Sequence, residues 1–148
     1  MTADSQWPLQ QAVFDALSAD ATLQSLTGQV PARVFDHVPQ DLWRAPDASG
    51  GFPPYVVIGL STARAFDSKT EDGCDQTLTI HIWSRHRGLK ETKQIMAAVV
   101  EALDRQALSV SGHDLIQLRF EFSDSFLEED GLTRHGVQRF RALTEANA

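Results

Sequence analysis

The histidines of this chain are the first residues to test for chemistry, because an imidazole can bind a metal or move a proton near neutral pH. There are five of them: His37, His81, His86, His113 and His135. They are scattered along the chain, and no two stand at the short spacing that is typical of a zinc site. The spacing therefore favours packed or solvated histidines over a metal centre.

Carboxylates gather at two predicted turns, with Glu71, Asp72 and Asp75 at one and residues 128–130 at the other. Neither stretch has the alternating oxygen ligands around a glycine that a calcium loop requires. A catalytic acid pair would need one carboxyl group in an apolar setting that raises its pKa, and these stretches are polar. We interpret both clusters as solvated turns.

The single cysteine, Cys74, could act as a nucleophile only beside a suitable base, and its position favours a small apolar core residue. The glycines Gly50 and Gly51 precede Phe52-Pro53-Pro54 instead of the Lys-Ser/Thr of a phosphate-binding loop. The sequence thus offers no catalytic, metal-binding or cofactor-binding residue, and we expect no enzyme and no cofactor.

Composition narrows the class of protein further. The chain has 148 residues, a net charge of −7 and a pI of about 5.1. An acidic chain is poorly suited to sequence-independent binding of nucleic acid, which requires clustered Lys and Arg. No run of apolar residues approaches the length of a membrane helix, and the N-terminus lacks the features of a signal peptide. We therefore expect a protein of the bacterial cytoplasm with no membrane contact.

The elements that hold these residues follow from hydrophobic periodicity. Residues 77–83 alternate as a strand that is covered on one face, and residues 90–103 follow with helical spacing. Leu9, Val13 and Leu17 form a helical stripe near the start, and further strands are predicted near residues 33–38, 55–66, 115–122 and 134–144. The order, one or two helices and then β-β-β-α-β-β, predicts an α+β fold. We expect a mainly antiparallel sheet with one long helix packed on a face and an N-terminal helix, as a single domain over residues 1–148.

The same periodicity predicts which side chains form the core: Leu78, Ile80, Ile82, Met96, Val99, Leu103, Ile116, Leu118 and Phe120. Candidate protein-interface residues are charged or aromatic and lie in loops, turns or the predicted hairpin after residue 60, without an obvious core partner: Trp43, Arg64, Phe66, Asp67, Lys69, Glu71, Asp72, Arg85 and Arg87. Exposed aromatic residues often mark protein contacts, and a small basic cluster can pair with the acidic turns of a neighbouring copy.

The order and spacing of five segments carry a resemblance to a known family: Leu26-Thr27-Gly28, Val34–Pro39, Pro54–Gly59, Ile80–Ser84 with the helix after it, and Arg134–Phe140. The chain resembles the tail-terminator, or tail-completion, proteins of long-tailed phages and of phage-derived gene transfer agents. No single segment is a strict motif, so the likeness lies in the arrangement over Leu9–Leu143.

The resemblance implies a structural virion protein of the tail or neck, assembled in the bacterial cytoplasm. It implies a homo-hexameric ring that caps the head-proximal end of the tail tube, stops polymerisation of the tube protein and joins the tail to the head–tail connector. DNA would pass through this ring without specific binding. Two alternatives remain at this stage: another neck protein of the same particle, an adaptor or stopper, or a small cytosolic ligand-binding or enzymatic α+β domain.

Overall fold

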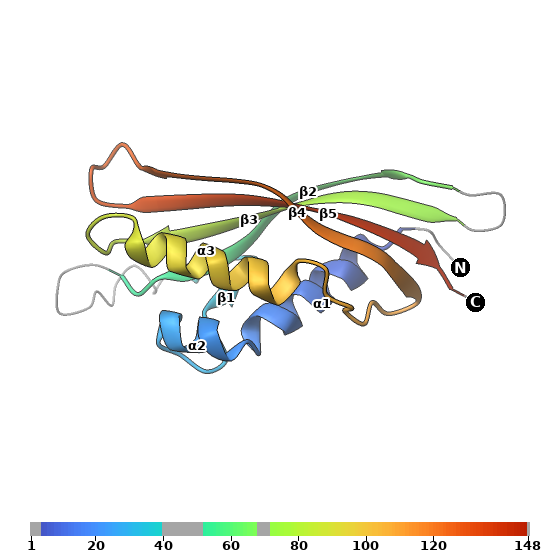
Figure 1. The fold of residues 1–148 in the computed structure, drawn as a ribbon, viewed down its shortest axis with the longest axis horizontal. Helices are drawn as coiled ribbons and strands as arrows, with labels where there is room; N and C mark the ends of the chain where they lie inside the picture. The colour runs from blue at the N-terminus through green and yellow to red at the C-terminus, as the bar shows by residue number, and fades with distance from the viewer. Residues whose placement is uncertain (1–3, 40–51, 68–71, 148) are drawn as a thin grey trace.

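All helices lie on one face of a five-stranded sheet in the computed structural model, which describes residues 4–39, 52–67 and 72–147 (Figure 1). The other face carries no helix in this part of the chain. The strand order is β1-β2-β3-β5-β4, so the last strand in the chain lies inside the sheet. This arrangement confirms the predicted α+β class, in which a helix layer covers the apolar face of a sheet.

Three helices are described: α1 (Gln6–Ser18), α2 (Ala21–Thr27) and α3 (Lys90–Leu103). The start of α2 is capped by Asp20, whose Oδ2 accepts a hydrogen bond of 3.0 Å from the backbone N–H of Leu23. Its end is fixed by Gly28, which has φ 73°. Only glycine adopts this left-handed conformation without steric cost, so both ends of α2 are set by local chemistry.

The strands are β1 (Val34–Phe35), β2 (Tyr55–Ala65), β3 (Gly73–Ser84), β4 (His113–Leu127) and β5 (Arg134–Ala146). The short strand β1 pairs in parallel with β2, and every other pairing is antiparallel. In the long register of β3 with β5, Leu78 pairs with Phe140 and Gly73 pairs with Glu145. The predicted element order is therefore confirmed. The bounds differ most in β4, which covers residues 113–127 instead of 115–122, and in β1, which covers 34–35 instead of 33–38, while β5 ends two residues later than expected.

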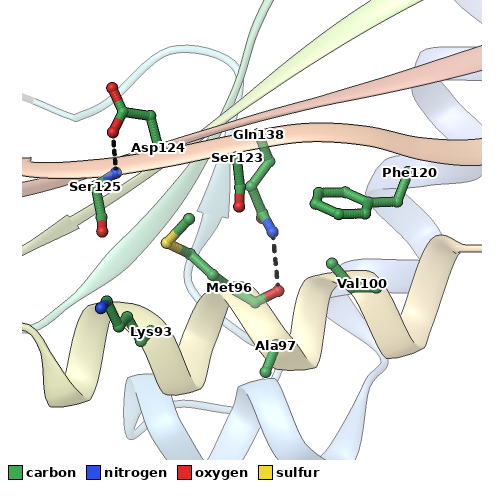
Figure 2. A pocket seen from close by; sticks show the side chains of 9 residues that line it. All are labelled: Lys93, Met96, Ala97, Val100, Phe120, Ser123, Asp124, Ser125 and Gln138. Atoms are coloured by element: carbon green, nitrogen blue, oxygen red, sulfur yellow. Dashed lines mark hydrogen bonds between the residues drawn. The ribbon is translucent and has the colours of Figure 1, made fainter.

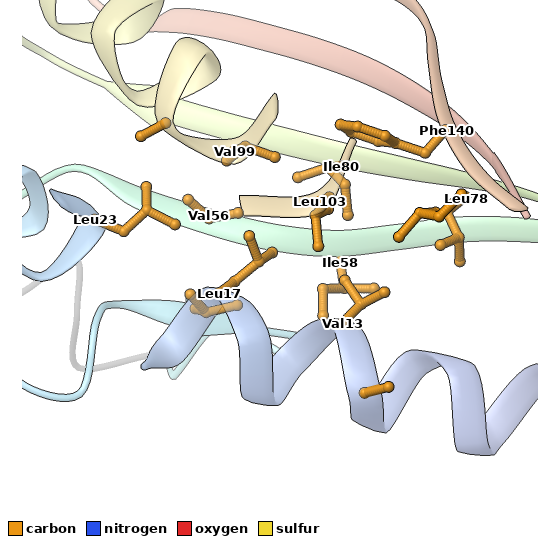
Figure 3. Packing of buried hydrophobic residues seen from close by; sticks show 14 of the residues in the cluster. Val13, Leu17, Leu23, Val56, Ile58, Leu78, Ile80, Val99, Leu103 and Phe140 are labelled. Atoms are coloured by element: carbon orange, nitrogen blue, oxygen red, sulfur yellow. The ribbon is translucent and has the colours of Figure 1, made fainter. Parts of the chain in front are cut away.

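The core fills the space between the helices and the sheet (Figure 3). Leu17 of α1 and Leu103 of α3 point at the sheet, where they meet Val56 of β2 and Ile80 of β3. Alternation along β3 is complete, since every second residue from Cys74 to Ser84 is buried. Cys74 itself is buried and unpaired with another cysteine, as expected of a small core residue.

Two of the predicted core residues are wrong, and both lie in β4. Ile116 is 55% exposed and Phe120 is 37% exposed, whereas Leu118 between them is only 2% exposed. The pairing of β4 with β5 is irregular between Leu115 and Gln117, so Ile116 is an extra residue without a partner. Such a bulge interrupts strict alternation. Phe120 faces the core side opposite Phe140, but β4 is the last strand of the sheet, so no further strand lies beside it.

Candidate protein-interface site

The predicted interface residues fall into two groups, and the first group surrounds the hairpin that joins β2 to β3. Arg64, Phe66, Asp67 and Asp72 are exposed there, while Trp43, Lys69 and Glu71 lie outside the described residues. The backbone N–H of Phe66 donates to the carbonyl of Gly73 over 2.9 Å. Asp67 Oδ1 also accepts from the N–H of Gly73, at 3.3 Å. Asp67 therefore closes the hairpin as well as facing solvent.

The second group lies at the turn between β3 and α3, where Arg87 is exposed and Arg85 is engaged within the chain. The Nε of Arg85 donates to the Thr133 hydroxyl at 3.2 Å, and its guanidinium lies 4.7 Å above the ring of Phe52. Its Nη2 is 3.8 Å from Asp130 Oδ2. Arg85 thus ties the β4–β5 turn to the β3–α3 turn, which leaves Arg87 as the freer cation for a partner.

Asp130 organises the acidic turn that Arg85 contacts. Its Oδ2 accepts from the Thr133 hydroxyl at 2.6 Å, and its Oδ1 accepts from the backbone N–H groups of Thr133 at 2.8 Å and Leu132 at 2.9 Å. The hydrogen bond from the Thr133 side chain, with those from the two backbone N–H groups, lowers the pKa of Asp130 to about 2. The turn is therefore built to keep a negative charge.

The structure does not bring the two groups together. They lie at opposite ends of the long axis of the molecule, with the β2–β3 hairpin at one end and the β3–α3 turn at the other (Figure 1). Strand β3 runs the whole way between them, from Gly73 to Ser84. At about 3.3 Å per residue this strand separates the two groups by roughly 36 Å. They are two surfaces and not one site.

Sequence reasoning missed a cluster on the helix-free face of the sheet. His81 Nδ1 lies 2.7 Å from His135 Nε2, and His135 Nδ1 lies 2.7 Å from Glu128 Oε1. An ionised Glu128 only accepts, so His135 donates to it and in turn accepts the Nδ1–H of His81. Trp83 stacks on His135 with ring centroids 3.8 Å apart, and Phe126 meets the same ring edge-on at 5.0 Å.

Burial lowers the pKa of His81 below its ordinary value, and the neighbouring His135 lowers it further. The cluster is therefore a hydrogen-bonded chain from His81 through His135 to Glu128, tied to an aromatic stack. The alternation of residues 77–83 puts His81 and Trp83 on the same face of a strand, which is the only sequence signal for the cluster. The pairing with His135 follows from the register of β3 with β5, which aligns Trp83 with His135.

A second feature of the same face is the ion pair between Asp75 and Arg141. Arg141 donates from Nε to Oδ1 at 3.0 Å and from Nη2 to Oδ2 at 2.7 Å. These hydrogen bonds hold the pKa of Asp75 below its ordinary value, against the opposing effect of burial. A two-point contact of this kind fixes the geometry of both side chains, so it stiffens the sheet near the β2–β3 hairpin.

One groove on the helix-covered side lies between α3 and the edge of the sheet (Figure 2). It has a volume of about 410 Å³, and Met96, Val100 and Phe120 supply its apolar wall. Beneath it the Gln138 amide donates to the carbonyl of Met96 at 3.0 Å. Lys93 and Asp124 are its ionisable side chains. One cation and one anion beside an apolar wall suit a contact with another protein.

Within the described residues, no group of three or more His, Cys, Asp or Glu side chains is arranged to hold a metal ion. None of the described helices is long and apolar enough to cross a membrane. The candidate surfaces of the molecule are therefore its two charged ends, the aromatic cluster on the helix-free face of the sheet and the groove beside α3.

Comparison with known proteins decides the family. Residues 11–145 match the family model described as tail completion protein gp17. The chain belongs to the tail completion protein family. The tail completion protein gp17 of Bacillus phage SPP1 is 30% identical over 94 residues, which make up 64% of this chain and 69% of that protein. A chain in the solved virion of a native gene transfer agent particle is 29% identical, with a TM-score of 0.82 over 98% of this chain and 100% of that chain.

Membership of the tail completion family confirms the resemblance that the sequence carries. The protein is a structural component of phage-type tails and not an enzyme, since the family is a structural one. The match with a virion chain extends over nearly the whole fold, so both ends of the molecule belong to the shared architecture.

Proposed function

We propose that this tail completion protein assembles as a homo-hexameric ring on the head-proximal end of a tail tube. The ring stops further addition of tube subunits and gives the head–tail connector a surface to join. DNA passes through the ring without specific binding. The observation that carries the proposal is the family membership, which covers residues 11–145.

The placement of charged and aromatic residues supports this function. A ring above a dimer needs two different surfaces on each subunit, and a cap needs further contacts with the structures above and below it. The β2–β3 hairpin and the β3–α3 turn stand at opposite ends of the sheet, which suits contacts with two different neighbours. The net charge of −7 opposes retention of DNA in the ring.

The interface residues stay part of the proposal. At the hairpin they are Arg64, Phe66, Asp67 and Asp72, and at the other end they are Arg85 and Arg87. Lys69 and Glu71, which fall between β2 and β3 in the sequence, and Trp43, which precedes β2, remain candidates from the sequence alone. We assign them to contacts with neighbouring copies, the tube or the connector. We also retain a single domain over residues 1–148, because the helices and the sheet share one core.

The decisive experiment removes the gene for this protein from a producing strain and measures tail length by electron microscopy. We expect abnormally long tubes that are not joined to heads. Loss of an adaptor or stopper would instead leave tails of normal length that fail to join. Tails of normal length in the absence of this protein would contradict the terminating role, and particle images with another symmetry at this layer would contradict the hexamer.

A variant pair tests the hairpin surface in the same strain. Phe66→Ser removes an exposed aromatic side chain, and Gln11→Ser is a matched control because Gln11 is exposed on α1. We expect Phe66→Ser to lower the fraction of particles with joined tails, whereas Gln11→Ser leaves it unchanged. Equal fractions in both variants would place the contact elsewhere.

A further inference from the structure

Among the described residues, the outer edge of β2 has no neighbouring strand over its second half. Strand β1 pairs only with Val56 and Val57, and β2 continues to Ala65. The hydrogen bond from Phe66 N–H to the Gly73 carbonyl places residue 66 in a bonded pair with β3. Because bonded and non-bonded pairs alternate in antiparallel strands, the N–H and C=O groups of Ser61, Ala63 and Ala65 point outward.

These outward groups have no hydrogen-bond partner among the described residues. Ser61 is half-buried, and Thr62, Ala63, Arg64 and Ala65 are exposed. A row of unpaired backbone groups on an exposed strand is a template for pairing with another chain.

The opposite edge of the sheet, formed by β4, is protected against pairing with another strand, in contrast to the β2 edge. On β4 the Leu118 carbonyl accepts from the backbone N–H of Arg105 at 2.8 Å, and the Phe120 N–H donates to Asp104 Oδ1 at 2.8 Å. The Ser125 N–H donates to the Asp124 side chain at 2.9 Å. Two bulges also interrupt this strand. Caps and bulges of this kind prevent pairing at an edge. No described residue caps residues 61–65 of β2 in this way, and the irregularity in the pairing of β2 with β3 lies before them, between Ile58 and Ser61.

The side chains beside the β2 edge indicate which side chains an added strand would need in order to fit there. On the helix-covered side, Ala63, Ala65 and Cys74 give a cavity of about 240 Å³ a mainly apolar lining, and Asp4, Gln6, Arg64 and Gly73 complete it. On the other side, Arg64 is the only charged residue of β2. Adjacent residues of a strand point to opposite faces, so the added strand would place an apolar side chain in the cavity and a neighbouring carboxylate beside Arg64.

We propose that the edge of β2 over Ser61–Ala65 binds an extended segment of a different protein of the particle, which adds as a strand and carries an apolar residue next to an acidic one. This inference rests on the proposed function, which supplies such neighbours. A second copy is the poorer occupant for two reasons. Its β4 edge is capped, and pairing of two β2 edges is symmetric and closes a dimer without extending a ring.

The first test is hydrogen–deuterium exchange on the unmodified protein, alone and in intact particles. In the purified protein the amides of Ser61, Ala63 and Ala65 exchange fast, because their N–H groups face solvent. In particles we expect a peptide over residues 60–66 to gain protection at about three amides. No gain in particles overturns the inference. Full protection in the purified protein, as a homo-oligomer, also overturns it, because the occupant is then a second copy.

The second test blocks the edge. Ala63→Pro removes one outward N–H and leaves the β3 pairing intact, since proline is tolerated on the open side of an edge strand. Ala63→Ser is the matched control that keeps the N–H. We expect Ala63→Pro to lower the yield of particles with joined tails about tenfold relative to Ala63→Ser, which corresponds to about 1.4 kcal/mol of binding.

The charge beside the edge provides a third comparison. Arg64→Glu reverses the only charge of β2 and is expected to lower the yield, whereas Arg64→Lys preserves it. Normal yields for both Ala63→Pro and Arg64→Glu overturn the inference. Such yields leave the terminating function intact, because that function is judged separately by tail length in the strain that lacks the gene. If Ala63→Pro fails to fold, the exchange measurement on the unmodified protein still decides.

Discussion

Leu118→Ala tests the register of β4, because this register decides which β4 side chains face the helices. Leu118 is 2% exposed and belongs to the main hydrophobic cluster, opposite Ala142. Truncation of a fully buried leucine removes its transfer free energy and leaves a cavity, so we expect a loss of about 2–5 kcal/mol in the free energy of unfolding. For a chain of this size each kcal/mol shifts the melting temperature by about 2–4 °C, so the midpoint falls by roughly 4–20 °C.

The matched control is Ile116→Ala, since strict alternation would put both residues in the core. Ile116 is the extra residue of the bulge and is 55% exposed, so its truncation should change the free energy of unfolding by less than about 0.5 kcal/mol. Urea unfolding followed by far-ultraviolet circular dichroism measures both losses by linear extrapolation. Similar large losses in the two variants would mean that β4 alternates without a bulge, and the register described above would be wrong.

Three further predictions concern the sheet. Gly73→Ala should destabilise the β2–β3 hairpin, because an added Cβ would overlap the carbonyl oxygen of Phe66; faster amide exchange at the hairpin in the variant checks this. Burial lowers the pKa of His81, so the unfolded chain binds more protons than the folded one just below pH 6.5, and stability should fall as the pH drops from about 6.5. His81→Gln should weaken this pH dependence, which urea midpoints measured between pH 7.5 and 5.5 would show. The single variant Arg141→Met should be less stable than the double variant that also carries Asp75→Asn, because the single change leaves the Asp75 carboxylate without the Arg141 guanidinium. Equal urea midpoints for the single and the double variant would contradict this.

Helices and strands whose apolar residues repeat at a regular spacing could be predicted from the sequence. The alternation of residues 77–83 and the helical spacing of residues 90–103 each report one covered face, and both elements appear where they were expected. Local chemistry also fixed the ends of α2 through Asp20 and Gly28. These signals are carried by neighbouring residues, so no tertiary information is needed to interpret them.

What could not be predicted depends on contacts between distant segments. The bulge at Ile116 has no local signature, because it is set by the pairing with β5. The chain from Glu128 through His135 to His81 joins residues that are up to 54 positions apart and is created by the same pairing. The engagement of Arg85 by Thr133 likewise needs the two turns to meet. The unpaired edge of β2 is visible only once the order of the strands is known.

The central position of β5 has a consequence for how the subunit is made. This strand follows all the others in the chain, yet it pairs with β3 on one side and β4 on the other. Until it leaves the ribosome, β3 lacks one partner and β4 lacks its only one, so the sheet closes late and through contacts of long sequence separation. Partly synthesised subunits therefore cannot present a finished surface. We expect that a chain cut before β5 neither folds nor assembles, because β3 and β4 would lack the pairings that close the sheet.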